Sequence, residues 1–137
     1  MKEEEALRLV NSFNFSADKA YPLKNEASGR VYWRATNQSE SIILCFLDPS
    51  LGNHNKFIDI SEQLSANDIS GVKVLHHDEK HGITIQNDLG DNDLLKVLDE
   101  NNKQELLNKS LDLLIDIQNI RFNNIDKFLS LIHISEP

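Results

Sequence analysis

Histidine and aspartate side chains gather in one short polar stretch, which is the densest group of potential metal ligands in the sequence. The stretch holds His76, His77, Asp78 and His81. Imidazole and carboxylate groups are common zinc ligands, but a structural zinc site needs four of them held in fixed geometry, and no second cluster supports this one. Polar residues between two short apolar runs are more typical of a turn. We therefore expect a charged turn here and no metal site.

A second group of interest combines small residues with arginine. Ser28 and Gly29 would let the backbone approach a ligand closely, and Arg30 and Arg34 supply positive charge in an acidic chain. Backbone amides and cations together favour an anionic ligand. Taken alone, however, the pattern favours an ordinary hairpin turn with two solvated arginines.

The single cysteine, Cys45, lies inside the apolar run of residues 42–47. One cysteine cannot form an intrachain disulfide, and a catalytic thiolate needs an electropositive, partly open setting that this run does not offer. We expect a buried, unreactive thiol.

Composition narrows the class of protein. The chain has 137 residues, 39% of them hydrophobic, which is enough for one compact domain with a core. Twenty-two acidic and fourteen basic residues give a net charge of -8, which disfavours nucleic acid as a partner. The acidic N-terminus differs from a signal peptide, and the longest apolar run is too short to span a bilayer. We expect a cytoplasmic protein with no membrane partner.

Hydrophobic periodicity predicts an α+β domain in which an antiparallel sheet is flanked by helices. The continuous apolar run of residues 41–48 is typical of a strand buried on both faces, and we expect it at the centre of the sheet. Residues 20–36 are expected to form one hairpin, and residues 71–75 and 82–86 another. Helices are expected over residues 2–13, 56–69, 92–98 and 103–120.

Three segments, taken in order, resemble a known family. They are residues 27–34, 42–44 and 85–91, with the sequences Ala-Ser-Gly-Arg-Val-Tyr-Trp-Arg, Ile-Ile-Leu and Ile-Gln-Asn-Asp-Leu-Gly-Asp. Their order and spacing over residues 7–118 resemble the N-terminal lobe of the aminoglycoside phosphotransferase family, and more closely its bacterial branch of cell-wall amino-sugar kinases. Each motif alone is weakly specific, whereas the combination is moderately specific. The resemblance implies a protein-kinase-like N-terminal lobe followed by the first helices of a truncated C-terminal lobe.

The resemblance also implies a division of the chain and a set of ATP-binding residues. Residues 1–88 would form the ATP-binding lobe, with a hinge beginning near residue 86, and residues 89–128 would begin the C-terminal lobe. ATP phosphates would lie under Ser28, Gly29 and Arg30, and adenine would lie at Asn87, Asp88 and Leu89. A polar turn with a helix cap is a compatible interpretation of the second segment.

Two groups that related kinases use are missing from the sequence. Protein kinases place a phosphate-binding lysine on the third strand, and residues 41–48 contain none, so we expect Glu62 on the following helix to be a solvated charge. The motif His-x-Asp-x-x-x-x-Asn positions the acceptor hydroxyl and magnesium. His76-His77-Asp78 matches its opening, but Ile83 stands at the asparagine position. We assign no catalytic residue and expect the magnesium ligands in the C-terminal lobe.

The last residues, 129–137, resemble a translated sequencing adapter. Their sequence is Leu-Ser-Leu-Ile-His-Ile-Ser-Glu-Pro, in which His133 repeats the opening of the kinase motif and Ser135 stands at the aspartate position. We expect the natural reading frame to be lost near Phe128 and this tail to be non-native.

The resemblance implies ATP-dependent phosphoryl transfer to a hydroxyl of an amino sugar, such as N-acetylmuramate or N-acetylglucosamine in cell-wall recycling. We expect this chain alone to be inactive. Kinases of similar architecture that act on choline, homoserine or an antibiotic remain alternatives, as does a non-catalytic binding or interaction module. The helix at residues 103–120 carries a wide apolar stripe that would normally pack against another lobe, formed by Leu106, Leu107, Leu111, Leu114 and Ile117. We therefore expect the chain either to be marginally stable or to self-associate through this stripe.

Overall fold

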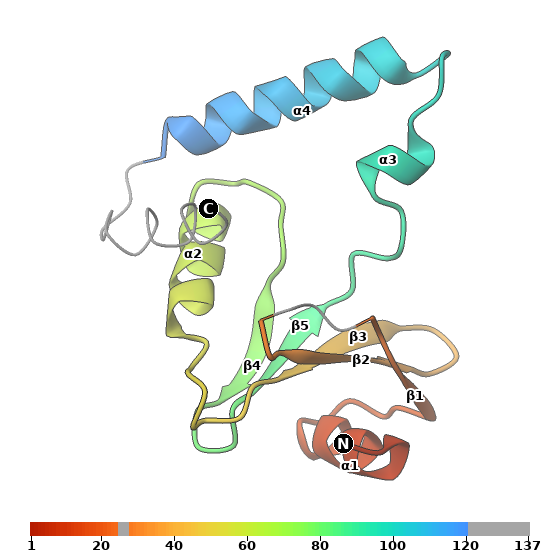
Figure 1. Ribbon diagram of the computed structural model, residues 1–137, viewed down its shortest axis with the longest axis vertical. Coiled ribbons are helices and arrows are strands. Elements are labelled where there is room, and N and C mark those ends of the chain that lie inside the picture. The colour runs from red at the N-terminus through yellow and green to blue at the C-terminus, as the bar shows by residue number, and fades with distance from the viewer. Residues whose placement is uncertain (25–27, 121–137) are drawn as a thin grey trace. The chain divides into compact units, whose positions relative to one another are not determined.

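The computed structural model describes residues 1–24 and 28–120 of the chain. Its five strands form one open antiparallel sheet in the order β1-β2-β3-β5-β4 (Figure 1). The strands are β1 (Lys19–Pro22), β2 (Val31–Thr36), β3 (Ser41–Phe46), β4 (Val74–Asp78) and β5 (Ile83–Asn87). The helices are α1 (Glu3–Ser12), α2 (Asn55–Ala66), α3 (Leu94–Val97) and α4 (Lys103–Gln118). The predicted α+β class, the two hairpins and the central position of β3 are confirmed.

The chain divides into two compact units. The first comprises Met1–Asp59 and Val72–Asp88, and the second comprises Ile60–Gly71 and Leu89–Pro137. All five strands therefore belong to the first unit, together with α1 and the beginning of α2.

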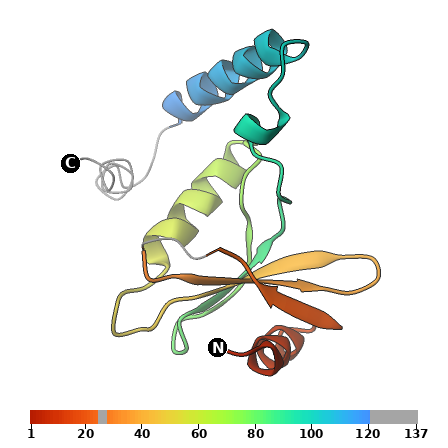
Figure 2. The same ribbon diagram turned by 45° about the vertical axis from the view of Figure 1, so that its right-hand side comes forward.

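Helix α1 covers one face of the sheet (Figure 2). Three glutamates occupy its first turn, where negative charge interacts favourably with the helix dipole. Ala6 and Val10 are four residues apart and fully buried, because this spacing places both on the side that faces the sheet. The core that they join is built by Ala20, Trp33, Ala35, Ile42, Leu44, Ile83 and Ile85.

The opposite face of the sheet is more polar. Side chains alternate between the two faces along a strand, so the neighbours of the core residues in sequence point away from α1. The residues of β2, β3 and β5, and the residue just after β5, whose side chains lie on this opposite face include Tyr32, Arg34, Ser41, Ile43, Cys45, Thr84, Gln86 and Asp88. We call this side of the sheet the polar face.

Two short turns fix the register of the sheet. Between β2 and β3, the Asn37 side-chain oxygen accepts hydrogen bonds from the backbone amides of Ser39 and Glu40, both at 2.9 Å. Between β4 and β5, Gly82 has a φ of +68°, and a Cβ atom there would lie 1.9 Å from the carbonyl oxygen of Leu47. Only glycine fits this second turn without displacing the end of β3.

The expected turn at residues 76–81 is shorter than predicted. His76, His77 and Asp78 pair with β5 and belong to strand β4. Because β4 lies at the edge of the sheet and its middle residues are exposed, polar side chains are tolerated there and conceal the strand from the sequence pattern.

The second unit contains the shorter helix α3 and the longer helix α4. The Asp93 side chain caps α3 by accepting a hydrogen bond from the Lys96 amide at 2.9 Å. Helix α4 has no buried residue. Within residues 1–24 and 28–120, no helix combines the length and apolar character needed to cross a membrane.

Candidate functional site

The polar face of the sheet carries most of the polar side chains that are removed from solvent in the first unit. Thr84 is fully buried, and Arg34 and Gln86 expose only 7% and 6% of their surface. The Gln86 side-chain amide donates to the Thr84 hydroxyl at 2.9 Å. Buried polar groups need such partners, because an unpaired one costs the free energy of its lost hydration.

An ion pair between Arg34 and Asp88 lies at one end of this face. The guanidinium donates Nε to Oδ2 at 2.6 Å and Nη2 to Oδ1 at 2.9 Å, which is the strong bidentate geometry. Ser41 adds a hydroxyl hydrogen bond to Oδ2 at 2.7 Å. The two side chains of the ion pair are 8% and 7% exposed. The interaction ties the middle of β2 to the end of β5.

This ion pair shows that Arg34 is not the solvated arginine that the alternative of an ordinary hairpin turn implied. The strand register sets Arg34 opposite Ile43, and Ile43 opposite Gln86. The long side chain of Arg34 therefore reaches Asp88, which follows Gln86 by two residues and lies just after β5. The carboxylate of Asp88 is therefore bound by Arg34 and Ser41 within the protein.

The thiol of Cys45 lies near the other end of the polar face. Cys45 is 1% exposed and free, which confirms the expected buried thiol. Burial raises its pKa, and the Tyr32 hydroxyl, the Arg30 charge and the Thr84 hydroxyl oppose this rise only in part. The thiol is thus kept protonated and unreactive.

The predicted phosphate-contacting residues lie just before β2, at this same end of the sheet. Ser28 and Gly29 are exposed, and Gly29 has a φ of +76°, a conformation that favours glycine. Arg30 is half-buried and donates Nη2 to the Asn53 carbonyl at a long 3.4 Å. Its positive charge also acts on Cys45 and His54. Residues 25–27 of the same turn are not among the described residues.

The predicted adenine-contacting residues lie at the opposite end of β5. Asn87 accepts a hydrogen bond from the Lys73 amide at 2.7 Å through its side chain, and its own amide donates to the Lys73 carbonyl at 3.1 Å. Asp88 is held in the ion pair. Leu89 is 63% exposed and begins the second unit.

The structure separates these two groups along the strands. Val31 pairs with Phe46, which pairs with Ile83, whereas Thr36 pairs with Ser41 close to Asp88. At a rise of about 3.4 Å per residue, the length of β2 amounts to about 17 Å. The groups do not meet at one point, and a ligand touching both would have to extend along the sheet.

His54 is a buried residue of this region that the sequence analysis missed. It is 1% exposed, and its Nε2 lies 2.9 Å from the Gly82 carbonyl oxygen. Burial lowers its pKa, and the charges of Arg30 and His77 lower it further, while the Gly82 carbonyl opposes the change. His54 stands in a Gly- and Asn-rich loop without apolar periodicity, so the sequence contained no signal for its burial.

The histidine-rich stretch forms no metal site among the described residues, where no group of three potential ligands gathers. His81 instead pairs with Asp78, with 2.7 Å between Nδ1 and Oδ2. His76 stacks on Phe13, the residue that follows α1, with ring centroids 5.4 Å apart. These contacts connect β4 and the β4–β5 turn to their surroundings.

The kinase features that the sequence lacks are not replaced on β3. The polar face of this strand carries Ser41, Ile43 and Cys45, and Glu62 on α2 is exposed, as expected. The suspected non-native tail at residues 129–137, with His133 and Ser135, lies outside the described residues.

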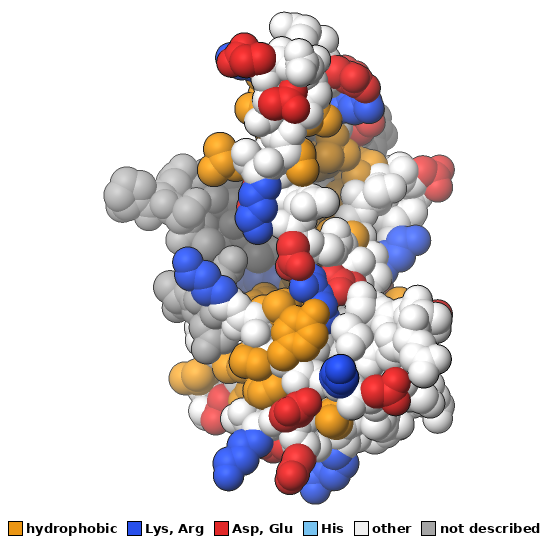
Figure 3. All heavy atoms as spheres, turned by 90° about the vertical axis from the view of Figure 1, so that its right-hand side faces the viewer, with side chains coloured by type: hydrophobic (Ala, Val, Ile, Leu, Met, Phe, Trp, Pro, Cys, Tyr) orange, Lys and Arg blue, Asp and Glu red, His pale blue; other side chains and the backbone are white. Residues whose placement is uncertain are grey.

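Figure 3 shows acidic and basic side chains interspersed with hydrophobic ones on one side of the molecule. On the described part of that side, no continuous basic patch is visible.

No protein-family model matches the sequence, and no curated protein matches it significantly.

Proposed function

We propose that this chain supplies the nucleotide-binding part of an ATP-dependent small-molecule phosphotransferase, with an amino sugar as the acceptor. The observation that carries the proposal is the arrangement of the sheet. A hairpin with a glycine turn and an arginine leads into a buried central strand, and the β5 exit lies at the other end of the same face. This is the order of elements that a protein-kinase-like N-terminal lobe requires.

The nucleotide would extend along the polar face. Arg30 is the cation suited to the phosphates, because it is half-buried near the glycine turn and its hydrogen bond to the Asn53 carbonyl is long, at 3.4 Å. Its charge matters because the chain carries a net charge of -8, which would otherwise repel ATP. The adenine edge would meet the backbone at Asn87, Asp88 and Leu89.

The Arg34–Asp88 ion pair has a positioning role in this proposal. It fixes the end of β5, from which the chain would lead into the hinge, against the middle of β2. Substrate-positioning elements must be held to well below 1 Å for efficient transfer. A rigid exit from β5 would therefore keep the adenine site in register with the phosphate site.

The phosphoryl-transfer step needs groups that we place in a C-terminal lobe. The sequence contains no complete His-x-Asp-x-x-x-x-Asn motif, so magnesium and the acceptor hydroxyl would both be held there. For the same reason, the 137-residue chain should bind nucleotide without transferring phosphate. The amino-sugar acceptor rests on the family resemblance alone.

Nucleotide binding tests the proposal directly. Thermal or urea unfolding of the chain is followed with increasing Mg-ATP, up to millimolar concentrations. A ligand at ten times its dissociation constant stabilises the native state by about 1.4 kcal/mol. Arg30→Ala should weaken the affinity for Mg-ATP about tenfold, so that more nucleotide is needed for the same stabilisation. Arg8→Ala on α1 should leave the affinity unchanged.

Two results would contradict the proposal. One is a stability that does not depend on nucleotide, which is the behaviour of a non-catalytic interaction module. The other is an equal loss of affinity in the Arg30 and Arg8 variants, which would indicate a non-specific charge effect.

A further inference from the structure

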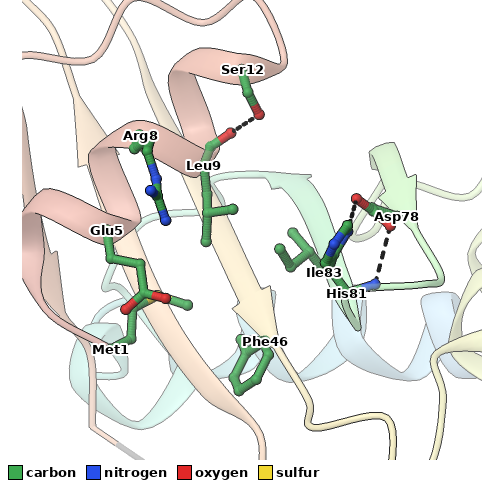
Figure 4. A pocket seen from close by; sticks show the side chains of 9 residues that line it. All are labelled: Met1, Glu5, Arg8, Leu9, Ser12, Phe46, Asp78, His81 and Ile83. Atoms are coloured by element: carbon green, nitrogen blue, oxygen red, sulfur yellow. Dashed lines mark hydrogen bonds and ion pairs between the residues drawn. The ribbon is translucent and has the colours of Figure 1, made fainter.

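A cavity opens on the other face of the sheet, between α1 and the end of the β4–β5 hairpin (Figure 4). Its volume is about 540 Å³, within the range of roughly 300 to 1,000 Å³ that is usual for small-molecule sites. The residues that line it all belong to the first unit, and they are Met1, Glu5, Arg8, Leu9, Ser12, Phe46, Asp78, His81 and Ile83.

The floor of the cavity is apolar. Ile83 is 2% exposed and belongs to the hydrophobic core, and Leu9 and Phe46 are partly buried against that core. A ring or aliphatic chain placed on this floor would remove further apolar surface from water, which is favourable by about 25 cal/mol per Å².

One wall of the cavity carries two opposite charges on α1. Glu5 and Arg8 are three residues apart, which places them on the same side of the helix. Figure 4 shows both side chains directed toward the space that Leu9 and Phe46 also line. Among the described residues, neither side chain makes a hydrogen bond or an ion pair with the protein.

On the opposite wall of the cavity, Asp78 and His81 are hydrogen-bonded to each other. The His81 ring lies 2.7 Å from Asp78 Oδ2, and the His81 amide donates to Oδ1 at 3.1 Å. These contacts hold the pKa of Asp78 below its ordinary value. The carboxylate thus stays ionised and adds negative charge at this wall, which disfavours a ligand that carries only negative charge.

From this arrangement we infer that the cavity binds a small zwitterion with an apolar group, the chemical class of the apolar α-amino acids. The ligand carboxylate would pair with Arg8 and its ammonium with Glu5, while its side chain would cover Phe46, Leu9 and Ile83. An α-amino acid carries its two charges a few ångströms apart, which matches two side chains on neighbouring turns of one helix.

This site is separate from the proposed nucleotide site. It lies on the face that α1 covers, and none of its lining residues belongs to the polar face. The inference therefore does not depend on the proposed phosphotransferase function, and either can fail without the other.

Three probes of one shape test the inference by titration calorimetry. L-phenylalanine carries both charges, 3-phenylpropionate lacks the ammonium group, and phenethylamine lacks the carboxylate. L-phenylalanine should bind saturably. Each of the other two probes should bind about tenfold more weakly, because 3-phenylpropionate loses the charge-assisted hydrogen bond to Glu5 and phenethylamine loses the one to Arg8.

Matched variants assign the charges. Arg8→Gln should weaken L-phenylalanine binding about tenfold and leave phenethylamine binding unchanged. Glu5→Gln should also weaken L-phenylalanine binding, but it should leave 3-phenylpropionate binding unchanged. Glu4→Gln, an exposed α1 residue outside the cavity, should change nothing. Unfolding midpoints equal to that of the wild type would show that the variants fold.

The inference is overturned if L-phenylalanine does not bind saturably, if the three probes bind equally, or if the Arg8 and Glu5 variants behave like Glu4→Gln. The first result would mean an empty surface hollow, and the second would mean apolar contact without charge recognition.

Discussion

At the residue scale, the Arg34–Asp88 ion pair is the most constrained polar interaction of the sheet. Taking two charges out of water is unfavourable, and their attraction offsets that cost only with good geometry and additional hydrogen bonds. The pair meets this condition through its bidentate contact and the Ser41 hydroxyl. Removing one partner would therefore leave an uncompensated buried charge.

Arg34→Met should destabilise the protein by about 3 to 5 kcal/mol, because Asp88 would remain charged and buried. The exposed Lys109–Glu105 pair on α4 offers a matched control, and Lys109→Met should change the stability little, because solvent screens this pair. Urea unfolding measures both. A double variant, R34M/D88N, should lose less stability than the sum of the two single variants. Equal small losses for Arg34→Met and Lys109→Met would show that the buried pair is not stabilising.

His54 should make stability depend on pH. Its pKa is lowered in the folded protein, so the unfolded chain binds the proton more readily. The contribution of neutral His54 to the free energy of unfolding is complete above the pKa of the unfolded chain, about 6.5. This contribution is lost as the pH falls through the lower pKa of the folded protein. Unfolding free energy should therefore decrease from pH 7.5 to pH 5.5, and His54→Gln should flatten this decrease.

The control for His54 is Lys80→Gln, which is exposed and removes no histidine. It should keep the wild-type pH dependence. An unchanged slope in His54→Gln would assign the dependence to other groups.

At the element scale, the β4–β5 turn joins three parts of the first unit. The Gly82 carbonyl accepts hydrogen bonds from the Leu47 amide and from His54 Nε2, both at 2.9 Å. The end of β3 and the segment that leads into α2 are thereby anchored to the hairpin. The conformation of this single glycine sets the position of both contacts.

Two glycine substitutions separate backbone strain from steric overlap. Gly82 and Gly90 both have positive φ, but a Cβ at Gly82 would lie 1.9 Å from the Leu47 carbonyl oxygen, whereas nothing lies within 4 Å of one at Gly90. Gly90→Ala should cost about 1 to 2 kcal/mol from strain. Gly82→Ala should cost a further 1 to 3 kcal/mol or more, because the β3 end must shift. Similar losses of unfolding free energy in the two variants would contradict this account.

Hydrophobic periodicity was sufficient to predict most elements, and its failures have physical causes. The run at β3 is apolar on both faces because both are buried, so its central position could be deduced. The exposed edge strand β4 has no such constraint, and its polar residues were taken for a turn. Helix α1 was recognised because its buried residues recur at helical spacing.

Within the candidate site, sequence could indicate residue types but not partners. The spacing along the chain does not reveal strand register, so the pairing of Arg34 with Asp88, 54 residues away, could not be deduced. The burial of His54 likewise depends on a tertiary contact with Gly82. By contrast, the glycine turn before Arg30 followed from local chemistry, because Gly29 adopts positive φ.

At the scale of the whole molecule, the apolar side of α4 is left without buried residues. Leu107, Leu111 and Leu114, which the sequence analysis placed on one stripe, expose 39%, 58% and 49% of their surface. Complete exposure of such a side chain forfeits about 1.5 to 3 kcal/mol. A contiguous patch of this kind favours association with another apolar surface.

The chain should therefore self-associate at micromolar or higher concentration. The triple variant Leu107→Lys, Leu111→Lys and Leu114→Lys should be monomeric in sedimentation velocity, because charge on this side of α4 prevents its burial. Asp116→Lys, an exposed position on the opposite side of α4, is the control. A wild-type chain that is monomeric and unfolds in one sharp transition would contradict the expectation.

The central claim is that the polar face between Arg30 and Asp88 binds an adenine nucleotide. Amide chemical shifts of the isotope-labelled chain, recorded with increasing concentrations of a non-hydrolysable Mg-ATP analogue, test it most directly. The account predicts saturable shifts at residues 28–34 and 84–90, which Arg30→Ala weakens and Arg8→Ala does not. Shifts that are absent at millimolar nucleotide, or that are confined to α1, would contradict it.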